Sequence, residues 1–311
     1  MKKLITYVVG DLLKSPARVL VNTVNTVGVM GKGIAKDFKI IYPEMFRQYQ
    51  NLCEKGLFHV GQLWLYKTPQ KWILNFPTKK HWRSKSKIEY IEAGLEKFIN
   101  TYMEKGITSI AFPMLGCGNG GLDWENEVRP LMENYLKNLP IDIYIHLYRK
   151  DPFEPEYRNI NKIKNWLRSE PESLAFVEVW EDIQNLVRQN DSYFTLNNKI
   201  GFTVSIISHP EEGLGIKTQG RIVHIYKSQL VDLWQHIRSF GFVIPSSMPS
   251  GMEKYTPFII AILHHLPYLK PVIISTKYQE MNKESIGLQY IPVNHIKNFN
   301  LEEVYLDEST N

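Results

Sequence analysis

Cysteine and long apolar runs are scarce in this chain. Its 311 residues include two cysteines, Cys53 and Cys117, which excludes a disulfide framework or a cysteine-based zinc site and suits a reducing compartment. The longest apolar run, PFIIAILHHLPYL at 257–269, is too short to span a bilayer. Near the N-terminus Gly10-Asp11 interrupts the apolar residues, so no signal peptide is expected. We therefore expect a cytoplasmic protein with no membrane contact.

Motifs for metal binding and for common nucleophiles are also missing. None of the nine histidines forms a pair four residues apart, and the adjacent His264 and His265 would point to different faces of a helix. Neither the G-x-S-x-G elbow of many hydrolases nor the phosphate-binding P-loop motif occurs. We expect no bound metal and no cofactor.

Charge is unevenly distributed along the chain. Residues 1–150 hold 22 Lys+Arg and 13 Asp+Glu, a net of +9, whereas residues 151–311 hold 15 and 19, a net of −4, which together give +5. A basic half is typical of proteins that bind polyanions. The sign of the net charge changes at the segment RKDPFEPEY, 149–157, which has two prolines and alternating acids. We therefore predict two domains, 1–150 and 156–311.

Strand-like and helix-like segments alternate through the first domain. Apolar runs typical of strands cover 4–10, 18–25, 62–67, 71–76, 109–115 and 142–148. Helical patterns cover 33–56, with a break near Pro43, then 87–106, and a segment that begins at Asp123. This order predicts an α/β fold, a three-layer α/β/α sandwich around a mixed sheet. Ligands of such sheets bind beyond the carboxyl ends of the strands, so the loops there are the candidate site.

Two glycine-rich loops follow predicted strands and lead into predicted helices. The first, TVGVMGKGIAKDF at 26–38, contains Gly28, Gly31 and Gly33, and the second is GCGNGG at 116–121. Backbone N–H groups at a helix N-terminus hold phosphates. The second loop also matches G-x-G-x-x-G, but it does not stand at the first strand–helix turn of a dinucleotide fold, which argues against an NAD site. The pair predicts a pyrophosphate site, with two tight turns as the alternative.

A basic segment with aromatic residues surrounds the end of the strand at 71–76. Within 17 residues fall Lys71, Lys79, Lys80, Arg83, Lys85 and Lys87, interleaved with Trp72 and Trp82. Cations contact the phosphates of nucleic acids, and aromatic rings stack on unpaired bases. We predict DNA contacts for Lys80, Trp82, Arg83 and Lys85, the alternative being a solvated basic loop with a buried tryptophan.

Two asparagines close the strand at 18–25. Asn22 and Asn25 have amides that could hydrogen-bond to a ribose or to a base edge. The alternative is that each amide bonds to its own backbone, as asparagine often does in turns.

Four segments of the first domain, taken in order, resemble a known family. ITYVVGDLL, VNTVNTVGVMGKGIAKDF, ILNFPTKKHWR and FPMLGCGNGGLDWE are similar to the macrodomain branch that contains terminal ADP-ribose protein glycohydrolases and DarG-type DNA ADP-ribosyl glycohydrolase antitoxins. The resemblance covers residues 1–148 and is strongest to the DarG type. It implies a fold that binds ADP-ribose, with Asp11 at the adenine and both loops around the pyrophosphate and distal ribose. The binding residues it implies are Asp11, Leu12, Asn22, Asn25, Gly31, Gly33, Ile34, Ala35, Thr78, Gly116, Cys117, Gly118, Asn119, Gly120 and Gly121.

The resemblance also implies a catalytic lysine. In this branch it directly follows a threonine at the end of a strand, which here gives Lys79 after Thr78. A lysine acts as nucleophile or base only as the neutral amine, and desolvation or a cationic neighbour such as Lys80 lowers its pKa. Neighbouring side chains on a strand point to opposite faces, so we expect one of these two lysines to enter the pocket. The alternative is that both lie in water at a strand end.

One position departs from the pattern of this branch. Members that act on proteins carry an aspartate in the loop after GCG, and the aligned residue here is Gly120. The departure favours a reaction that relies on Lys79 with water or with the substrate itself. Asp123, close by in sequence, is expected to cap a helix.

The second domain has no motif that we can connect to a reaction. Amphipathic helical patterns cover 173–189 and 227–242, and strand patterns cover 202–209, 220–226 and 270–277, which predicts a compact α+β domain. The resemblance implies that this domain binds and blocks a DNA ADP-ribosyltransferase toxin of the DarT type.

These observations predict an antitoxin with two activities. The macrodomain removes ADP-ribose from ADP-ribosylated single-stranded DNA and releases it as product, and the second domain neutralises the toxin. Two alternatives stay open: a module that binds ADP-ribose without chemistry, and a hydrolase of ADP-ribosyl-glutamate esters on proteins, against which Gly120 argues.

Overall fold

The computed structural model describes residues 5–147, 160–197, 199–218, 220–274 and 285–291. They divide into two compact units, Met1–Lys164 and Asn165–Asn311. The predicted connection at 149–157 lies outside the described residues, so the domain boundaries at 150 and 156 stay predictions.

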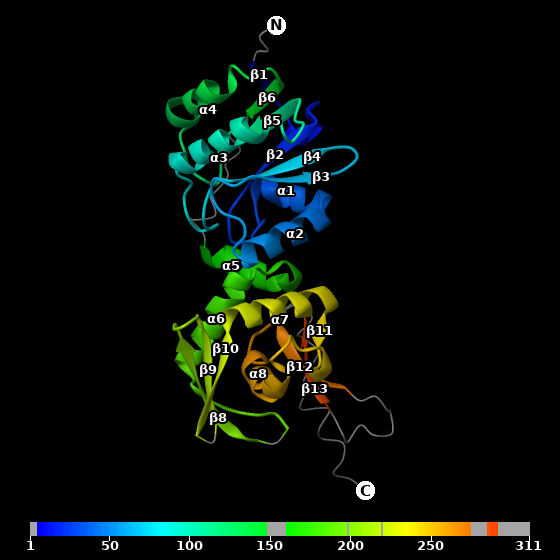
Figure 1. Cartoon of the computed structure of the whole chain (residues 1–311), viewed down its shortest axis with the longest axis vertical. Coiled ribbons are helices and arrows are strands. Elements are labelled where there is room, and N and C mark those ends of the chain that lie inside the picture. The colour runs from blue at the N-terminus through cyan, green and yellow to red at the C-terminus, as the bar shows by residue number, and fades with distance from the viewer. Residues whose placement is uncertain (1–4, 148–159, 198, 219, 275–284, 292–311) are drawn as a thin grey trace. The chain divides into compact units, whose positions relative to one another are not determined.

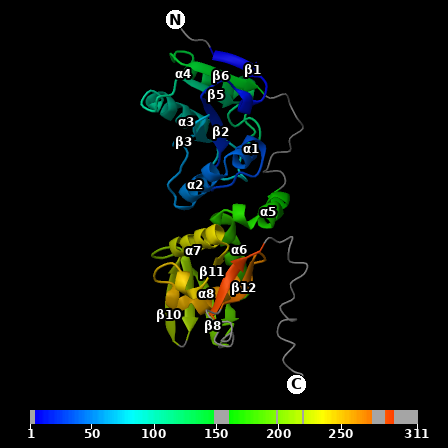
Figure 2. The same cartoon turned by 90° about the vertical axis from the view of Figure 1, so that its right-hand side faces the viewer.

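The first unit is built on a six-stranded mixed sheet. Its strands are β1 (Ile5–Val9), β2 (Val19–Val24), β3 (Trp64–Lys67), β4 (Trp72–Pro77), β5 (Ser109–Pro113) and β6 (Asp142–Leu147). The order is β1-β6-β5-β2-β4-β3, and Figure 2 shows β1 beside β6 at one edge. Every neighbouring pair is parallel except β3 and β4. The prediction of a mixed sheet is confirmed.

Helices cover both faces of this sheet, as the three-layer prediction requires. They are α1 (Gly33–Ile41), α2 (Pro43–Glu54), α3 (Ile88–Thr101) and α4 (Arg129–Leu136), the last preceded by a π-helical turn, Trp124–Val128. Side chains alternate between the faces of a strand. In β2, Leu20 therefore packs with residues of α1 and α2, and Val21 packs with residues of α3 and α4. Pro43 separates α1 from α2 because proline fits the first turn of a helix but not its interior.

The topology brings the candidate loops to one edge of the sheet. Because β1, β2, β4, β5 and β6 are mutually parallel, their carboxyl ends lie together. The segments that leave this edge begin at Gly10, Asn25, Thr78 and Met114. All the loops singled out in the sequence are among them.

The second unit has the predicted α+β composition. Its helices are α5 (Ile160–Ser169), which spans the division between the units, α6 (Phe176–Gln189), α7 (Lys227–Phe240) and α8 (Thr256–Leu263). Four antiparallel strands follow the order β10 (Arg221–Tyr226), β9 (Gly213–Thr218), β8 (Gly201–Ile207) and β7 (Ser192–Phe194), and three more follow the order β11 (Phe242–Val243), β13 (Ser285–Tyr290) and β12 (Leu269–Ile274). Helix α8 lies between the two sheets and contacts β7 and β13 (Figure 1).

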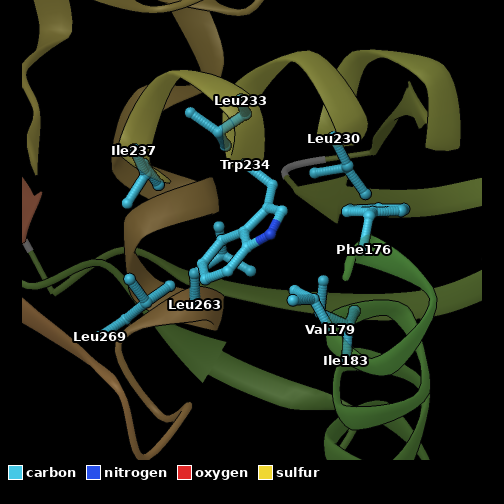
Figure 3. A pocket seen from close by; sticks show the side chains of 9 residues that line it. All are labelled: Phe176, Val179, Ile183, Leu230, Leu233, Trp234, Ile237, Leu263 and Leu269. Atoms are coloured by element: carbon cyan, nitrogen blue, oxygen red, sulfur yellow. The ribbon is translucent and has the colours of Figure 1, made fainter. Parts of the chain in front are cut away.

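The interior of the second unit contains a small apolar cavity. Nine side chains from α6, α7, α8 and β12 surround a space of about 10 Å³, with Trp234 at its centre (Figure 3). The indole Nε1 of Trp234 donates to the carbonyl oxygen of Leu174 at 2.9 Å. Ligand pockets have volumes of several hundred Å³. This cavity is therefore a gap in core packing.

Two polar clusters connect the elements of the second unit. Arg168 of α5 contacts Asp182 of α6 at 2.6 Å, and the hydroxyl of Tyr268 donates to the same carboxylate at 3.1 Å. Lys227 of α7 contacts Glu212 at 2.6 Å. These clusters join helices to each other and to the loop before β9.

Candidate functional site

Backbone and side-chain hydrogen bonds join the loops at the carboxyl edge of the first sheet. The N–H of Thr78 donates to Val24, and Thr26 donates to the carbonyl of Lys80 through its N–H at 3.2 Å and its hydroxyl at 2.8 Å. The N–H of Ser86 donates to the carbonyl of Gly120 at 3.0 Å. These hydrogen bonds thus connect the segments after β2, β4 and β5 to one another.

The two adjacent lysines at the end of β4 lie in opposite environments. Lys79 is 6% exposed, whereas Lys80 is exposed. The Nζ atom of Lys79 donates to the carbonyl oxygens of Asn119 at 3.0 Å and of Trp82 at 3.3 Å. Thr78, directly before it, is buried. The alternation expected at a strand end therefore places Lys79 among the loops.

The loop after β2 is shaped by the side chain of Asn25. Its Nδ2 donates to the carbonyl of Val29 at 2.6 Å, and its Oδ1 accepts from the N–H of Val27 at 3.1 Å and from Tyr49 at 3.2 Å. The amide is thus committed to its own loop and to Tyr49. In this structure the Asn25 amide holds the loop in shape, and its predicted contact with a ribose or a base edge stays a prediction.

Asn22 has a similar interior role. It is 0% exposed, and its Nδ2 donates to Oδ1 of Asn75, its partner across the β2–β4 pair, at 2.9 Å. Within the described part of the chain its own Oδ1 has no hydrogen-bond partner. The Asn22 side chain does not reach the protein surface, so a ribose or base contact at the surface is excluded in this conformation.

The first helix begins with backbone groups suited to an anion. Lys32 is the N-cap of α1 and makes no capping hydrogen bond through its side chain in the described structure. The first N–H groups of a helix lack partners within the helix and carry partial positive charge. Gly31, Gly33, Ile34 and Ala35 surround this N-terminus and are partly exposed. The predicted pyrophosphate contact fits here.

The helical turn after the second glycine loop differs. The carboxylate of Asp123 accepts from the N–H of Asn126 at 2.9 Å, as the capping prediction required. The Asp123 carboxylate thus caps the turn after the second loop, whereas α1 has no side-chain cap among the residues that the structure describes; the phosphate contacts of both loops stay predictions.

The GD motif after β1 forms a short turn. Oδ1 of Asp11 accepts from the N–H of Leu13 at 2.9 Å, and the Asp11 side chain is exposed. The side chain of Leu12 is buried in the core with α1 and α2, and the predicted contact of this residue with the ligand stays a prediction. On the other side of the motif, Nδ1 of His146 lies 3.0 Å from the carbonyl oxygen of Gly10.

The loop 116–121 packs tightly against its neighbours. Gly116 and Gly121 have positive φ angles of 71° and 76°, which other residues adopt rarely. Gly120 is constrained by space: a Cβ there would overlap Oγ of Ser86 and the carbonyl oxygen of Gly116. The Nδ2 atom of Asn119 lies 2.9 Å from the position that a Cβ on Gly33 would take. The two glycine-rich loops that are predicted to hold the pyrophosphate therefore lie next to each other.

Comparisons with known proteins agree with this arrangement. The Macro domain family model matches residues 21–131, which run from β2 into α4. The solved macrodomain of Mycobacterium tuberculosis DarG is 48% identical and covers 48% of this chain and 99% of that one, with a TM-score of 0.45. Residues 21–131 of the first unit thus match the macrodomain family.

Curated relatives of the macrodomain come from several bacteria. The DNA ADP-ribosyl glycohydrolase of Mycobacterium tuberculosis is 49% identical over 147 residues, 46% of this chain and 42% of the relative. The protein of the same name from Thermus aquaticus is 37% identical over 204 residues, 61% of this chain and 55% of the relative. A DNA ADP-ribosyl transferase-DNA ADP-ribosyl glycohydrolase fusion protein from Thermosipho africanus is 39% identical, over 48% of this chain and 43% of the relative. The chain thus spans about half the length of these proteins.

The basic segment of the macrodomain divides into two parts. Lys71 precedes β4 at the opposite edge of the sheet, where its Nζ donates to the carbonyls of Ser15 at 2.7 Å and Ala17 at 2.6 Å. Trp82 is 0% exposed, so the prediction that its ring stacks on a DNA base is corrected. The guanidinium of Arg83 lies 4.9 Å above that ring. Lys80 and Lys85 are exposed near the site and remain predicted DNA contacts with Arg83.

Cys117 lines the glycine loop as an inert thiol. Burial, with the carboxylates of Asp123 and Glu127 nearby, raises its pKa to about 12, so the thiol stays protonated at neutral pH. Its Sγ lies 3.4 Å from the carbonyl oxygen of Leu115. The structure thus gives no support to a nucleophilic role for Cys117, and its predicted contact with ADP-ribose stays a prediction.

Sequence reasoning missed Ser86, Asn75 and His146. Each is buried and touches a residue of the candidate site: Gly120, Asn22 and Gly10 respectively. The register of β2 against β4 would have pointed to Asn75, whereas no local pattern marks Ser86. Among the described residues no group of three or more His, Cys, Asp and Glu side chains is placed to hold a metal, and no helix is long and apolar enough to cross a membrane.

Proposed function

We propose that the macrodomain removes ADP-ribose from modified DNA bases and that the second unit binds and blocks a DNA ADP-ribosyltransferase toxin. The observation that carries the first part is the position of Lys79. A buried amine at the end of β4 is held 3.0 Å from the Asn119 carbonyl of the glycine loop, at the edge of the sheet where ligands of α/β folds bind. The names of the relatives, which include DNA ADP-ribosyl glycohydrolases up to 49% identical, support the activity.

The proposed ligand fits the arrangement of the loops. The N-terminus of α1 offers N–H groups for the pyrophosphate, and Asp11 has an exposed carboxylate that can accept a hydrogen bond from the adenine amino group. The distal ribose then lies toward the loop 116–121 and Lys79. In the overall reaction, water adds to the anomeric carbon, the bond to the base nitrogen breaks, and the base leaves with a proton.

Lys79 supplies the amine for this step. Its two carbonyl partners accept hydrogen bonds and fix the direction of the side chain. To act as nucleophile or base toward the anomeric carbon, the amine must lose its proton.

The geometry around Gly120 supports DNA over protein esters as the substrate. The expected carboxylate of protein-directed relatives does not fit, because even a Cβ at this position would overlap Ser86 and Gly116. The exposed cations Lys80 and Lys85, with Arg83, are suited to contact phosphates on either side of a modified base. ADP-ribosylated single-stranded DNA is therefore the proposed substrate.

The second unit is proposed to bind the toxin. The fusion relative joins a DNA ADP-ribosyl transferase and a glycohydrolase in one chain, which supports a functional link between the two activities. The alignment to the Thermus aquaticus relative covers 61% of this chain, more than the 164 residues of the first unit, so it extends into the second unit. The two free thiols are compatible with the proposed cytoplasmic location.

The test uses oligonucleotides that each carry one ADP-ribose on a defined base, and an ADP-ribosylated protein. We expect the full chain to release ADP-ribose from an oligonucleotide and to leave the protein adduct intact. Binding of free ADP-ribose without release from any substrate would support the alternative of a non-catalytic reader, and release from the protein would support the ester hydrolase. Coexpression with a DNA ADP-ribosyltransferase toxin tests the second unit: a chain with an inactive macrodomain should still protect the cells.

A further inference from the structure

Ser86 lies between the proposed catalytic lysine and the glycine loop without an assigned role. It is 6% exposed, and its N–H donates to the carbonyl of Gly120 at 3.0 Å. The next residue back along that loop, Asn119, accepts the hydrogen bond from Lys79. Ser86 and Lys79 thus donate hydrogen bonds to the carbonyl groups of two successive residues of the same loop, Gly120 and Asn119.

The hydroxyl of Ser86 occupies the space over Gly120. Its Oγ is the nearest atom to the position that a Cβ on Gly120 would take, and its Cβ is 3.1 Å from the corresponding position on Gly116. Gly120 does not have a positive φ angle, so backbone conformation does not require glycine there. The side chain of Ser86 and the carbonyl of Gly116 explain why position 120 carries no side chain.

The buried hydroxyl has no hydrogen-bond partner among the described residues. A buried hydroxyl that lacks a partner destabilises the fold, and alanine would fill the same place without that cost. Oγ of Ser109 in the same unit, by contrast, accepts from the N–H of Arg18 at 2.8 Å. Unsatisfied buried polar groups are typical of positions that gain a partner during function.

We propose that Ser86 is a further substrate-binding residue of this site and that its hydroxyl hydrogen-bonds to the distal ribose of ADP-ribose. It provides a neutral polar group where protein-directed relatives carry a carboxylate. This inference rests on the proposed function.

Access to Ser86 and to Lys79 depends on one segment. The loop 116–121 touches both side chains, and both are nine-tenths buried or more. Four of its six residues are glycine, and nothing lies within 4 Å of a Cβ position on Gly118. Glycine permits backbone conformations closed to other residues. Substrate contact with the amine and the hydroxyl therefore requires this loop to move.

Binding of two ligands to Ser86→Ala tests the proposal. ADP-ribose and ADP share adenine and pyrophosphate, but ADP lacks the distal ribose. Calorimetry on the full chain should show a Kd for ADP-ribose raised roughly tenfold in Ser86→Ala, as the loss of one hydrogen bond implies, with the Kd for ADP unchanged. The thermal midpoint of the variant should equal or exceed that of the wild type because the unsatisfied hydroxyl is gone.

Ser109→Ala is the matched control. It removes a hydroxyl that has a partner, at the amino end of β5 and away from the loops, so it should lower the thermal midpoint and change neither Kd. Equal weakening of ADP-ribose and ADP in Ser86→Ala, or no change in either, would overturn the inference. A wild-type chain that does not prefer ADP-ribose to ADP would instead contradict the proposed function.

Discussion

The Nζ atom of Lys79 and the carbonyl oxygen of Asn119 are 3.0 Å apart, although 40 residues separate them in the sequence. Lys79 leaves the end of β4 and Asn119 belongs to the loop after β5, and both strands are neighbours of β2. The contact therefore joins the proposed reactive group to the loop that is expected to hold the distal ribose. Movement of either partner changes the position of the other.

Two substitutions in the glycine loop test whether position 120 requires glycine because a side chain has no room there. In Gly120→Ala the new methyl group overlaps Ser86 and Gly116, so the loop must shift. We expect the affinity for ADP-ribose to fall roughly tenfold or more, because overpacking typically costs about 1–3 kcal/mol. Gly118→Ala is the control, since it has open space and no positive φ angle. Calorimetry that finds equal affinities in the two variants would contradict the packing at Gly120.

The cations near the site should determine DNA affinity through charge. Replacement of Lys80, Arg83 and Lys85 by alanine removes up to three cations that can neutralise phosphates. The slope of log K against log salt for an oligonucleotide should then decrease by roughly one for each phosphate that is no longer neutralised. Lys71→Ala, which changes a lysine at the other edge of the sheet, should leave that slope unchanged. Fluorescence anisotropy over a salt series measures both, and equal slopes in wild type and triple variant would exclude this surface.

The ion pair between Arg168 and Asp182 should stabilise the second unit. Both side chains are 16% exposed, so Asp182→Ala removes the acceptor of the Tyr268 hydroxyl and leaves the largely buried guanidinium with the more distant Glu178, 3.5 Å away. We expect the free energy of unfolding to fall by about 3 kcal/mol or more. The pair of Arg47 and Glu44, 66% and 57% exposed, provides the control, and Glu44→Ala should cost less than about 1 kcal/mol. Urea unfolding would contradict the prediction if both losses were equal.

The second unit should lose stability in mild acid. Burial, with His265 and Lys270 nearby, lowers the pKa of His264 from its ordinary 6.5 to about 4. As pH falls from about 6.5 to about 4, the unfolded chain takes up a proton on His264 that the folded chain refuses, so unfolding becomes more favourable. His264→Gln should flatten this part of the pH profile of the thermal midpoint. His224→Gln, on the exposed face of β10, should leave the profile as in the wild type; an identical profile in His264→Gln would contradict the assignment.

The sequence predicted the parts of the fold that local pattern determines. Apolar runs located all six strands of the first sheet, Pro43 marked the break between α1 and α2, and Asp123 was identified as a cap. Each depends on residues close together in sequence. The alternation at the end of β4 likewise predicted that one of Lys79 and Lys80 turns inward.

Contacts between loops from different strands could not be predicted in this way. The full burial of Trp82 and the packing of Ser86 against Gly120 depend on how the segment after β4 meets the segment after β5. The sequence pattern of residues 79–87 does not indicate this contact between the two segments. For the amide of Asn25 a turn role was one of two interpretations, and its hydrogen bonds within the loop show that role.

The most direct test of the central claim is single-turnover release of ADP-ribose from a singly ADP-ribosylated oligonucleotide by the wild type and by Lys79→Ala, Lys79→Arg and Lys80→Ala. We predict that both Lys79 variants release no ADP-ribose yet still bind it, because backbone groups hold the pyrophosphate and a guanidinium does not lose its proton to act as nucleophile or base. Lys80→Ala should retain activity, slowed by roughly tenfold for each pKa unit by which its charge assists Lys79. Retained activity in Lys79→Ala with full loss in Lys80→Ala, or retained activity in all three variants, would contradict the assignment of Lys79 as the catalytic amine.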